Sequence, residues 1–420
     1  MAQSTMTAGQ SVSNVDPNDK LAAGSVIGAH ALQHAYQHGF YLILPLIYSS
    51  MALSPAALGL IETSRRLFSG GASMGGGFIL DRFQHKRIAV LYGSLIVMGF
   101  GYLAVGLAPN YYIILLAAGL AGAAGSIWHP AAIGLLSQRY PERRGFVVSL
   151  HRSLGSVGDT AGPLIFGGLL IYFMWQGILL GALPLSLLFA SVLWMVLRNS
   201  STWQTFNEKP RTGEARPWSE QFRSLGGLFQ SRGLVLLLLV SGLAGLGQGG
   251  LLLWLPTYLQ ETQGMGSGGQ GIHLALLTGL GIATGPFIGG LSDRIGRKPV
   301  IIGVLATKAF IATLMALAGG GILLTIAVAM MGLVMFGVNS LVQAGALDIA
   351  EGRKLEGSMI GLLWGFNALF VGFSPLFLGF LIGAVGFGIL FWYIALMNLI
   401  ALCVAFVIPA TGKKKLAATA

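Results

Sequence analysis

The sequence predicts an all-α polytopic membrane protein with twelve transmembrane helices in two pseudo-symmetric six-helix bundles. Three observations predict it: 54% of the 420 residues are hydrophobic and only 9% are charged, the long apolar stretches show no strand-like alternation, and the two halves of the chain repeat. A soluble domain carries about a quarter charged residues. A chain this apolar places most of its surface in lipid, where only helices and closed barrels satisfy their backbone groups. The composition therefore argues against a soluble enzyme.

Twelve apolar stretches are long enough to cross a bilayer as helices, which takes about 20 residues. They cover residues 21–48, 56–80, 88–108, 111–137, 146–173, 176–197, 233–259, 270–291, 299–319, 321–347, 358–382 and 386–410. The widest polar gap separates two sets of six. The predicted organisation is a cytoplasmic N-terminal tail (1–20), an N-terminal bundle (21–197), a cytoplasmic linker (198–232), a C-terminal bundle (233–410) and a cytoplasmic C-terminal tail (411–420).

The 25 lysines and arginines fall on one side of the predicted membrane. The tails and the loops after even-numbered spans hold 21 of them, four lie inside spans, and the opposite loops hold none. By the positive-inside rule, both termini lie in the cytoplasm and the chain is a multi-pass protein of a cell inner membrane or plasma membrane. The net charge of +11 then reflects topology, and no nucleic-acid partner is expected.

The two halves repeat at a constant offset. Asp81 and Asp293 stand 212 residues apart, and so do Pro163 and Pro375. Each pair occupies corresponding places in the two sets of six spans. Repeated halves of this kind are typical of secondary transporters, which bind their substrate at the interface between the halves.

A charged loop motif follows the second and the eighth spans. It reads Gly289-x3-Asp293-Arg294-x-Gly296-Arg297 in the C-terminal half and Gly77-x3-Asp81-Arg82 in the N-terminal half. The motif resembles the loop signature of the major facilitator superfamily, although Gln84 replaces the second glycine in the N-terminal copy. The resemblance implies two bundles that rock about a central site and a gating role for these residues. Ordinary inside-positive anchoring is the alternative.

Two other segments resemble a narrower branch, which contains the fosmidomycin-resistance exporters. They are His34-x3-His38-x6-Pro45 and the stretch from Ser126 through His129-Pro130. In that branch an aspartate commonly stands where this chain has His38. The resemblance implies export of a small solute.

Glycine and proline recur together in the fifth and eighth spans, as Gly158-x3-Gly162-Pro163 and Gly285-Pro286. The first resembles the antiporter motif of drug exporters. Such spacing favours kinked, closely packed helices that act as hinges, and generic membrane-helix packing is the alternative.

Ionisable residues inside a membrane are costly and usually mark function. His34 and His38 share one face of the first span, because four residues turn a helix by little more than one revolution. Histidine titrates near neutral pH, so both are candidates for proton coupling. Glu62 and Asp159 are the alternative carriers. A purely structural role for the histidines, as hydrogen-bond partners of neighbouring helices, stays open.

Arginines in the N-terminal half point to the charge of the substrate. Arg65, Arg66 and Arg152 are opposed there by two carboxylates, so a positive balance favours an anionic or zwitterionic solute. The alternative is that Glu62 neutralises Arg66 and Asp159 neutralises Arg152. The predicted substrate-binding residues are Tyr41, Arg65, Arg66, His129, His151, Arg152, Gln248, Trp254, Asn339, Trp364 and Asn367.

The sequence thus predicts a monomeric secondary active transporter that works by alternating access, with a small molecule, protons and the lipid bilayer as partners. Proton-coupled antiport exporting a small organic anion or amphiphilic drug is the main hypothesis, and proton-coupled uptake of a small carboxylate or other organic anion is the alternative. A membrane-embedded receptor or enzyme without transport is the rival from another class. No catalytic residue, cofactor or resident metal is expected, because no nucleotide motif has its context and Cys403 is the single cysteine.

Overall fold

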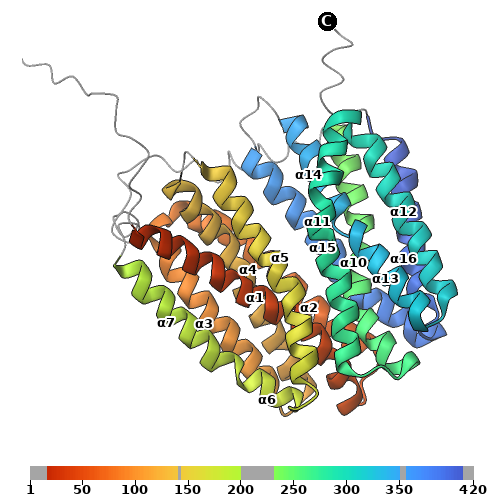
Figure 1. The fold of residues 1–420 in the computed structure, drawn as a ribbon, viewed down its shortest axis with the longest axis horizontal. Coiled ribbons are helices and arrows are strands. Elements are labelled where there is room, and N and C mark those ends of the chain that lie inside the picture. Colours follow the sequence, from red (N-terminus) through yellow and green to blue (C-terminus); the bar gives the residue numbers. More distant parts are fainter. Residues whose placement is uncertain (1–16, 141–142, 200–230, 351–355, 410–420) are drawn as a thin grey trace, which may run out of the picture.

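The computed structural model describes residues 17–140, 143–199, 231–350 and 356–409 (Figure 1). Most of the predicted tails and linker fall outside these ranges. Within them, the side chains of Asp81, Arg82 and Trp364 are also outside the described part of the structure.

The described chain is helical throughout and contains no strand. The N-terminal half comprises α1 (Pro17–Ser50), α2 (Pro55–Arg82), the short 3-10 turn η1 (Gln84–Lys86), α3 (Arg87–Gly106), α4 (Tyr111–Arg139), α5 (Arg144–Leu169), α6 (Trp175–Leu180) and α7 (Ala182–Arg198). The C-terminal half comprises α10 (Arg232–Gln263), α11 (Ser267–Ile295), α12 (Arg297–Ala318), α13 (Gly321–Val334), α14 (Gly337–Ala350), α15 (Glu356–Val385) and α16 (Ile389–Phe406). Each predicted span is one helix or two in succession, and the fold-class prediction is confirmed.

Local sequence sets several helix ends. Ser54 caps α2 by accepting a hydrogen bond from the backbone N–H of Ala57 at 3.2 Å, just before a proline in the first helical position. Asn110 caps α4 in the same way. Gly264 ends α10 with a left-handed φ of 59°, which glycine adopts without steric cost.

The tenth span is interrupted between α13 and α14, and Lys308 lies beside the break. This lysine on α12 is buried, and its Nζ donates to the carbonyl oxygen of Met335 at 3.3 Å. A carbonyl released from the helical ladder needs such a donor, since the membrane interior supplies no water.

The membrane-spanning character is uneven along the chain. Nine spans among the described residues are long and apolar enough to cross a bilayer. The helices α1, α2 and α5 are long enough but more polar, and they carry most of the ionisable residues of the N-terminal half. Helices of this composition need shelter from lipid, so their polar faces are expected to meet inside the protein.

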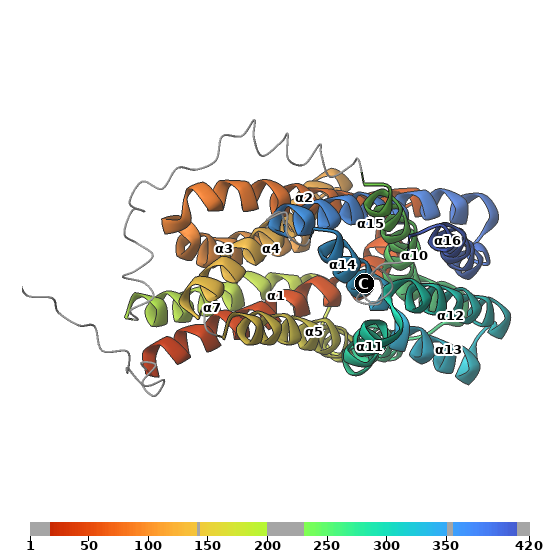
Figure 2. The same cartoon turned by 90° about the horizontal axis from the view of Figure 1, so that it is seen from above.

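The two bundles meet along two seams (Figure 2). Helix α2 packs against α15 along one edge, and α5 packs against α11 along the other. Glycines permit the close approach: a Cβ added to Gly59 would lie 2.4 Å from the carbonyl oxygen of Pro375, and one added to Gly271 would lie 2.5 Å from that of Pro163.

We call the side where α1 begins and α16 ends the terminal face, and the opposite side the distal face (Figure 1). At the distal face the bundles are tied by hydrogen bonds between the ends of α1 and α10. Gln260 Nε2 donates to Ser49 Oγ at 2.8 Å, and Ser49 Oγ donates to Glu261 at 3.4 Å. The bundles therefore touch at the distal face.

The glycines proposed as hinges do different things in the two halves. A Cβ at Gly158 or Gly162 would lie 2.3 or 2.2 Å from a carbonyl oxygen of α1, so both let α5 pack directly on α1. Gly285 on α11 has nothing within 4 Å of an added Cβ. Helices α5 and α11 both continue through their prolines, Pro163 and Pro286.

Replacing Gly162 by alanine should destabilise the N-terminal bundle. The new methyl group would collide with the backbone of Ala35, and overpacking of this kind costs about 1 to 3 kcal/mol. The melting temperature of the purified protein in detergent should fall. Gly168→Ala on the same helix is the control, because nothing lies within 4 Å of its added Cβ. Equal melting temperatures for the two variants would contradict the close α1–α5 contact.

Candidate functional site

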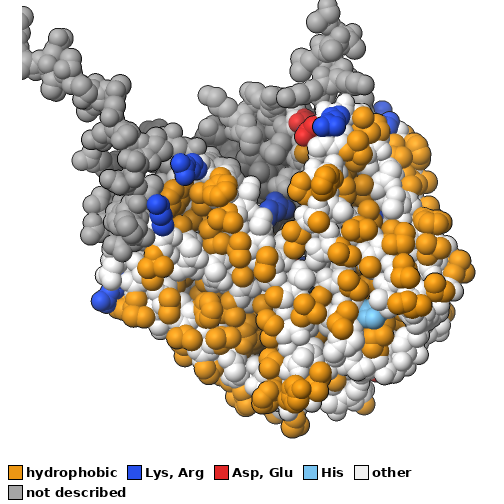
Figure 3. Space-filling view, in the orientation of Figure 1, with side chains coloured by type: hydrophobic (Ala, Val, Ile, Leu, Met, Phe, Trp, Pro, Cys, Tyr) orange, Lys and Arg blue, Asp and Glu red, His pale blue; other side chains and the backbone are white. Residues whose placement is uncertain are grey.

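A cavity of about 250 Å³ lies between the two bundles and receives side chains from both. The space-filling view shows Lys and Arg side chains, in blue, mainly on the part of the surface toward the terminal face (Figure 3). Its described lining is Arg66, Ser69, Arg152, Ser241, Asn339, Val342, Gln343, Leu363, Asn367, Ala368 and Val371.

The cavity lies inside the helical part of both bundles. Arg152 stands 8 residues into α5 and Asn367 stands 11 residues into α15, both counted from the terminal face. At 1.5 Å per residue, this is about 12 to 17 Å along the helix.

A charged network on α1 and α2 reaches the cavity through Arg66. Tyr41 and Arg65, predicted as substrate-binding, are buried behind it and are not among the cavity's described lining residues. Glu62 is buried, and its carboxylate accepts hydrogen bonds from Arg65 Nε at 2.7 Å and Nη2 at 2.8 Å, and from Arg66 Nε at 2.7 Å. Tyr41 donates its hydroxyl to the same carboxylate at 2.9 Å, and it accepts from both arginines. Two guanidinium groups thus share one carboxylate, which leaves one positive charge in excess at the cavity.

The second polar group joins α1 to α5. The Nδ1 atoms of His34 and His38 each lie 2.6 Å from Oδ1 of Asp159. The ring of His38 is also 5.7 Å from that of Tyr41, measured between centroids, so this group adjoins the Glu62 network. The sequence placed His34 and His38 on one face, and the fold brings Asp159 to that face.

The sequence left open whether Asp159 neutralises Arg152, and in the structure Asp159 pairs with His34 and His38 instead. Its carboxylate meets the two histidines, whereas Arg152 Nη1 donates across the cavity to Gln343 Oε1 at 3.5 Å. The other pairing that the sequence left open, of Glu62 with Arg66, is present, and Arg65 pairs with the same carboxylate.

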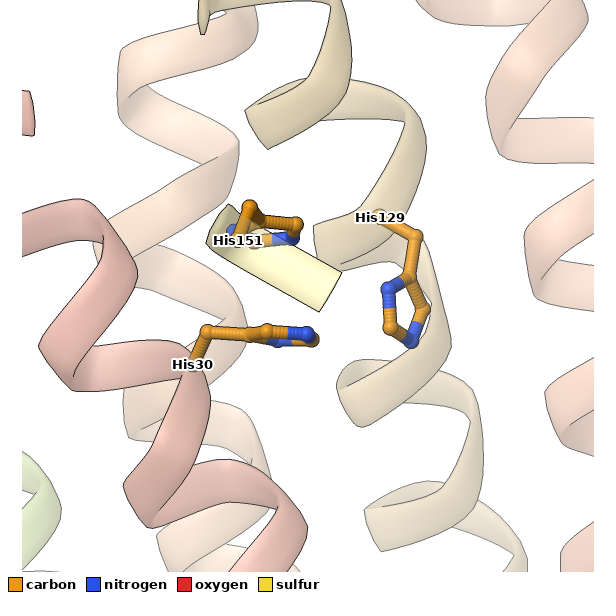
Figure 4. A group of neighbouring side chains, drawn as sticks. All are labelled: His30, His129 and His151. Atoms are coloured by element: carbon orange, nitrogen blue, oxygen red, sulfur yellow. The ribbon is translucent and has the colours of Figure 1, made fainter. Parts of the chain in front are cut away.

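Behind the cavity, four histidines of α1, α4 and α5 pack together. His30 stacks on His151 with 3.8 Å between ring centroids, and His129 stands nearly perpendicular to His30 at 5.0 Å (Figure 4). The ring of His34 is 4.4 Å from that of His30. His129 and His151, predicted as substrate-binding, are not among the cavity's lining residues.

The C-terminal half contributes amides. Asn339 Nδ2 donates to Gln248 Oε1 at 3.2 Å, and Asn367 Nδ2 donates to the backbone oxygen of Ser241 at 3.0 Å. Trp254, which the sequence placed in the substrate site, is completely buried. Its indole N–H donates to the carbonyl oxygen of Pro375 at 3.1 Å, so it holds α10 to α15 instead of lining the cavity.

The predicted gate is described in the C-terminal half alone. Arg297 pairs with Asp293 at 2.5 Å and with Asp348 on α14 at 3.2 Å, and so ties the α11–α12 connection to α14. Gly296 joins the two helices with a φ of 98°, which side chains rarely adopt. Arg294 is exposed. Gly77 and Gly289 have open space around an added Cβ.

Several residues of this site carry no recognisable motif. Ser69, Ser241 and Gln343 line the cavity, and Asp348 completes the contacts of Arg297. Their one signal in the sequence is a polar side chain inside or at the end of an apolar span. That signal does not say which face of its helix meets the other bundle.

Comparisons with known proteins agree with this architecture. A family model described as Major Facilitator Superfamily matches residues 26–369. A fosmidomycin resistance protein of Escherichia coli (strain K12) is 24% identical over 347 residues, which cover 82% of each chain. A Na(+), Li(+), K(+)/H(+) antiporter of Planococcus maritimus is 28% identical over 240 residues, and this match spans only 54% of that protein and 53% of this chain.

A solved structure shows the same fold. It is a bacterial homologue of the human lysosomal transporter Spinster, in an inward-facing and unoccupied conformation. The TM-score is 0.78 at 14% identity, over 94% of this chain and 98% of that one. The helices, the repeated halves and the matching family model together show that the chain is a membrane transporter that belongs to the Major Facilitator Superfamily.

Proposed function

We propose that this transporter is a proton-coupled antiporter that exports a small organic anion or an anionic amphiphilic drug by alternating access. The observation that carries the proposal is the placement of Arg66 and Arg152 at the cavity between the bundles, beside the carboxylate–histidine group of Asp159.

The charge of the cavity favours an anion. Arg65 and Arg66 share the single carboxylate of Glu62, and Asp159 is engaged by histidines. A guanidinium group binds carboxylate or phosphonate through two parallel hydrogen bonds, and the interaction gains strength away from bulk water. Gln343 and Asn367 offer neutral hydrogen bonds from the facing bundle. An anion between the bundles would therefore contact both of them.

Helix α5 connects proton binding to movement. It carries Asp159, and it carries Arg152 two turns nearer the terminal face. The backbone oxygen of Asp159 also accepts a hydrogen bond from Thr278 Oγ1 of α11, at 3.0 Å across the seam between the bundles. Gaining or losing a proton at Asp159 changes its hold on His34 and His38, next to a contact that must shift when the bundles rock.

The side and the direction of transport follow from charge and relatives. The positive-inside rule assigns the terminal face to the cytoplasm of a cell with this protein in its inner or plasma membrane. Hydrogen bonds of Ser49 with Gln260 and Glu261 join the bundles at the opposite face, which supports an inward-facing state. Export is supported by relatives whose names include fosmidomycin resistance, lincomycin resistance and cephamycin export. The antiporter relative supports exchange against protons. Uptake of a carboxylate with protons is the second candidate.

Anions should stabilise the protein against thermal unfolding, and this stabilisation should depend on Arg152. In a thermal-shift screen, alkylphosphonates and monocarboxylates should raise the melting temperature, whereas alkylammonium ions of equal length should not. Arg152→Gln should weaken anion binding by about tenfold or more, because it removes a charged hydrogen-bond donor. Ser153→Ala, next to it on the exposed side of α5, is the control. Stabilisation by the cations, or unchanged anion affinity in Arg152→Gln, would rule out the anion assignment.

The direction of the proton gradient should separate antiport from symport. Proteoliposomes that are acidic inside should accumulate a labelled anion found in the screen, since outward proton flow drives exchange. Asp159→Asn should abolish this accumulation and retain anion exchange without a gradient. His273→Asn is the control, because His273 lies on α11 with both ring nitrogens hydrogen-bonded, to Gly269 and Thr325.

Accumulation driven by acid outside would favour the uptake alternative. If Asp159→Asn and His38→Asn both kept the gradient dependence of the unmodified protein, the proton role of this group would be wrong.

A further inference from the structure

We propose that His30, His129 and His151 form a binding site for a divalent transition metal of the zinc class inside the N-terminal bundle. The three residues come from three helices, α1, α4 and α5, and their rings face one another (Figure 4). One ligand nitrogen from each lies within 4.8 Å of the other two. The sequence shows three histidines four residues apart on the first span, His30, His34 and His38, and the fold brings His129 and His151 to the first of them.

Three buried ring nitrogens of His30 and His151 lack the hydrogen-bond partners that such atoms normally have. His30 and His151 are each 2% exposed. Nδ1 of His30 and both ring nitrogens of His151 make no hydrogen bond within the described structure. Burying a polar atom without a partner is unfavourable, so three such nitrogens in two stacked rings favour a ligand. A metal ion that accepts lone pairs from neutral imidazoles would satisfy them.

The donor set selects the kind of metal. Three neutral imidazoles without a thiolate suit Zn²⁺, Cu²⁺, Ni²⁺ or Fe²⁺, whereas Ca²⁺ and Mg²⁺ prefer oxygen ligands. Three histidines with an open fourth position form one of the known tetrahedral zinc arrangements. The fourth ligand would be water or a solute.

The rings must turn to close on the metal. His30 and His151 lie nearly parallel, at 13°, so their nitrogens do not yet point at one atom. Zinc–nitrogen bonds of about 2.0 to 2.1 Å bring the ligand nitrogens of a tetrahedral site to about 3.3 Å from one another. No hydrogen bond holds the His151 ring, so its rotation breaks none. The helices need not separate, since the change is one of side-chain torsion.

The neighbouring group of His34, His38 and Asp159 is a weaker candidate. Its three side chains also lie within 4.8 Å, but the two Nδ1 atoms already meet the Asp159 carboxylate at 2.6 Å each. A metal there would have to displace these contacts, whereas a metal at the other cluster would give a partner to Nδ1 of His30 or a ring nitrogen of His151. Occupancy of the His30 group would tie α1, α4 and α5 together.

Metal binding by the purified full-length chain tests this site, independently of any transport. The protein should carry a tag without histidines and be stripped with chelator before titration with Zn²⁺ or Co²⁺. We expect Zn²⁺ to raise the melting temperature, Mg²⁺ to have no such effect, and Co²⁺ to give the strong visible absorption of a tetrahedral ion at one metal per chain. His30→Gln and His151→Gln should each weaken Co²⁺ binding by about tenfold or more.

Two control variants keep the assignment specific. His38→Gln removes a member of the neighbouring group, and His273→Gln removes a histidine of α11 whose ring is already satisfied. Both should retain the Co²⁺ spectrum. His129→Gln replaces either test variant that does not yield monodisperse protein. Absence of a Co²⁺ signal in the unmodified chain would overturn the proposal, and so would a signal lost in His38→Gln and kept in His151→Gln.

Discussion

Charge inside a bilayer is stable only where the protein itself satisfies it, and this constraint organises the N-terminal bundle. Glu62 is buried among two arginines and a tyrosine, and Asp159 is held by two histidines. These contacts bind α2 and α5 to the polar face of α1. Of the three more polar helices, α1 packs along α5, and the contacts of Tyr41 join α1 to α2.

The same constraint explains the asymmetry between the halves. In the C-terminal half, the described cavity lining is amide, hydroxyl and apolar, and its buried Lys308 serves the break between α13 and α14. Amides such as Asn367 and Asn339 hydrogen-bond to their own bundle and need no counter-charge. The charged side chains of the described cavity lining thus come from one bundle, and the other provides amide, hydroxyl and apolar groups.

Helix α5 shows how close packing and chemistry coincide. Gly158 and Gly162 bring its backbone onto α1, and this approach lets Asp159 reach the histidines of the neighbouring helix. On its opposite side, α5 meets α11 through Thr278 and through the close pair of Gly271 and Pro163. Helix α5 thus carries the Asp159 group and also forms part of the contact between the two bundles.

The sequence by itself determined the features that depend on local spacing, namely the helices and the ion pairs within one helix. Apolar length sets the helices, and the three- and four-residue steps from Glu62 to Arg65 and Arg66 bring one carboxylate to two arginines on one helix face. The contact of Asp293 with Arg297 also joins residues close in sequence, but it crosses the turn at Gly296 between two helices.

Only the tertiary structure decided the contacts between distant segments. Asp159 contacts two histidines that are 125 and 121 residues away in the sequence, and not the nearby Arg152. Trp254 packs between α10 and α15, and three histidines from separate helices lie in one cluster. The reason is geometric: a sequence fixes which residues share a face of a helix, but which faces meet depends on how all the helices pack together.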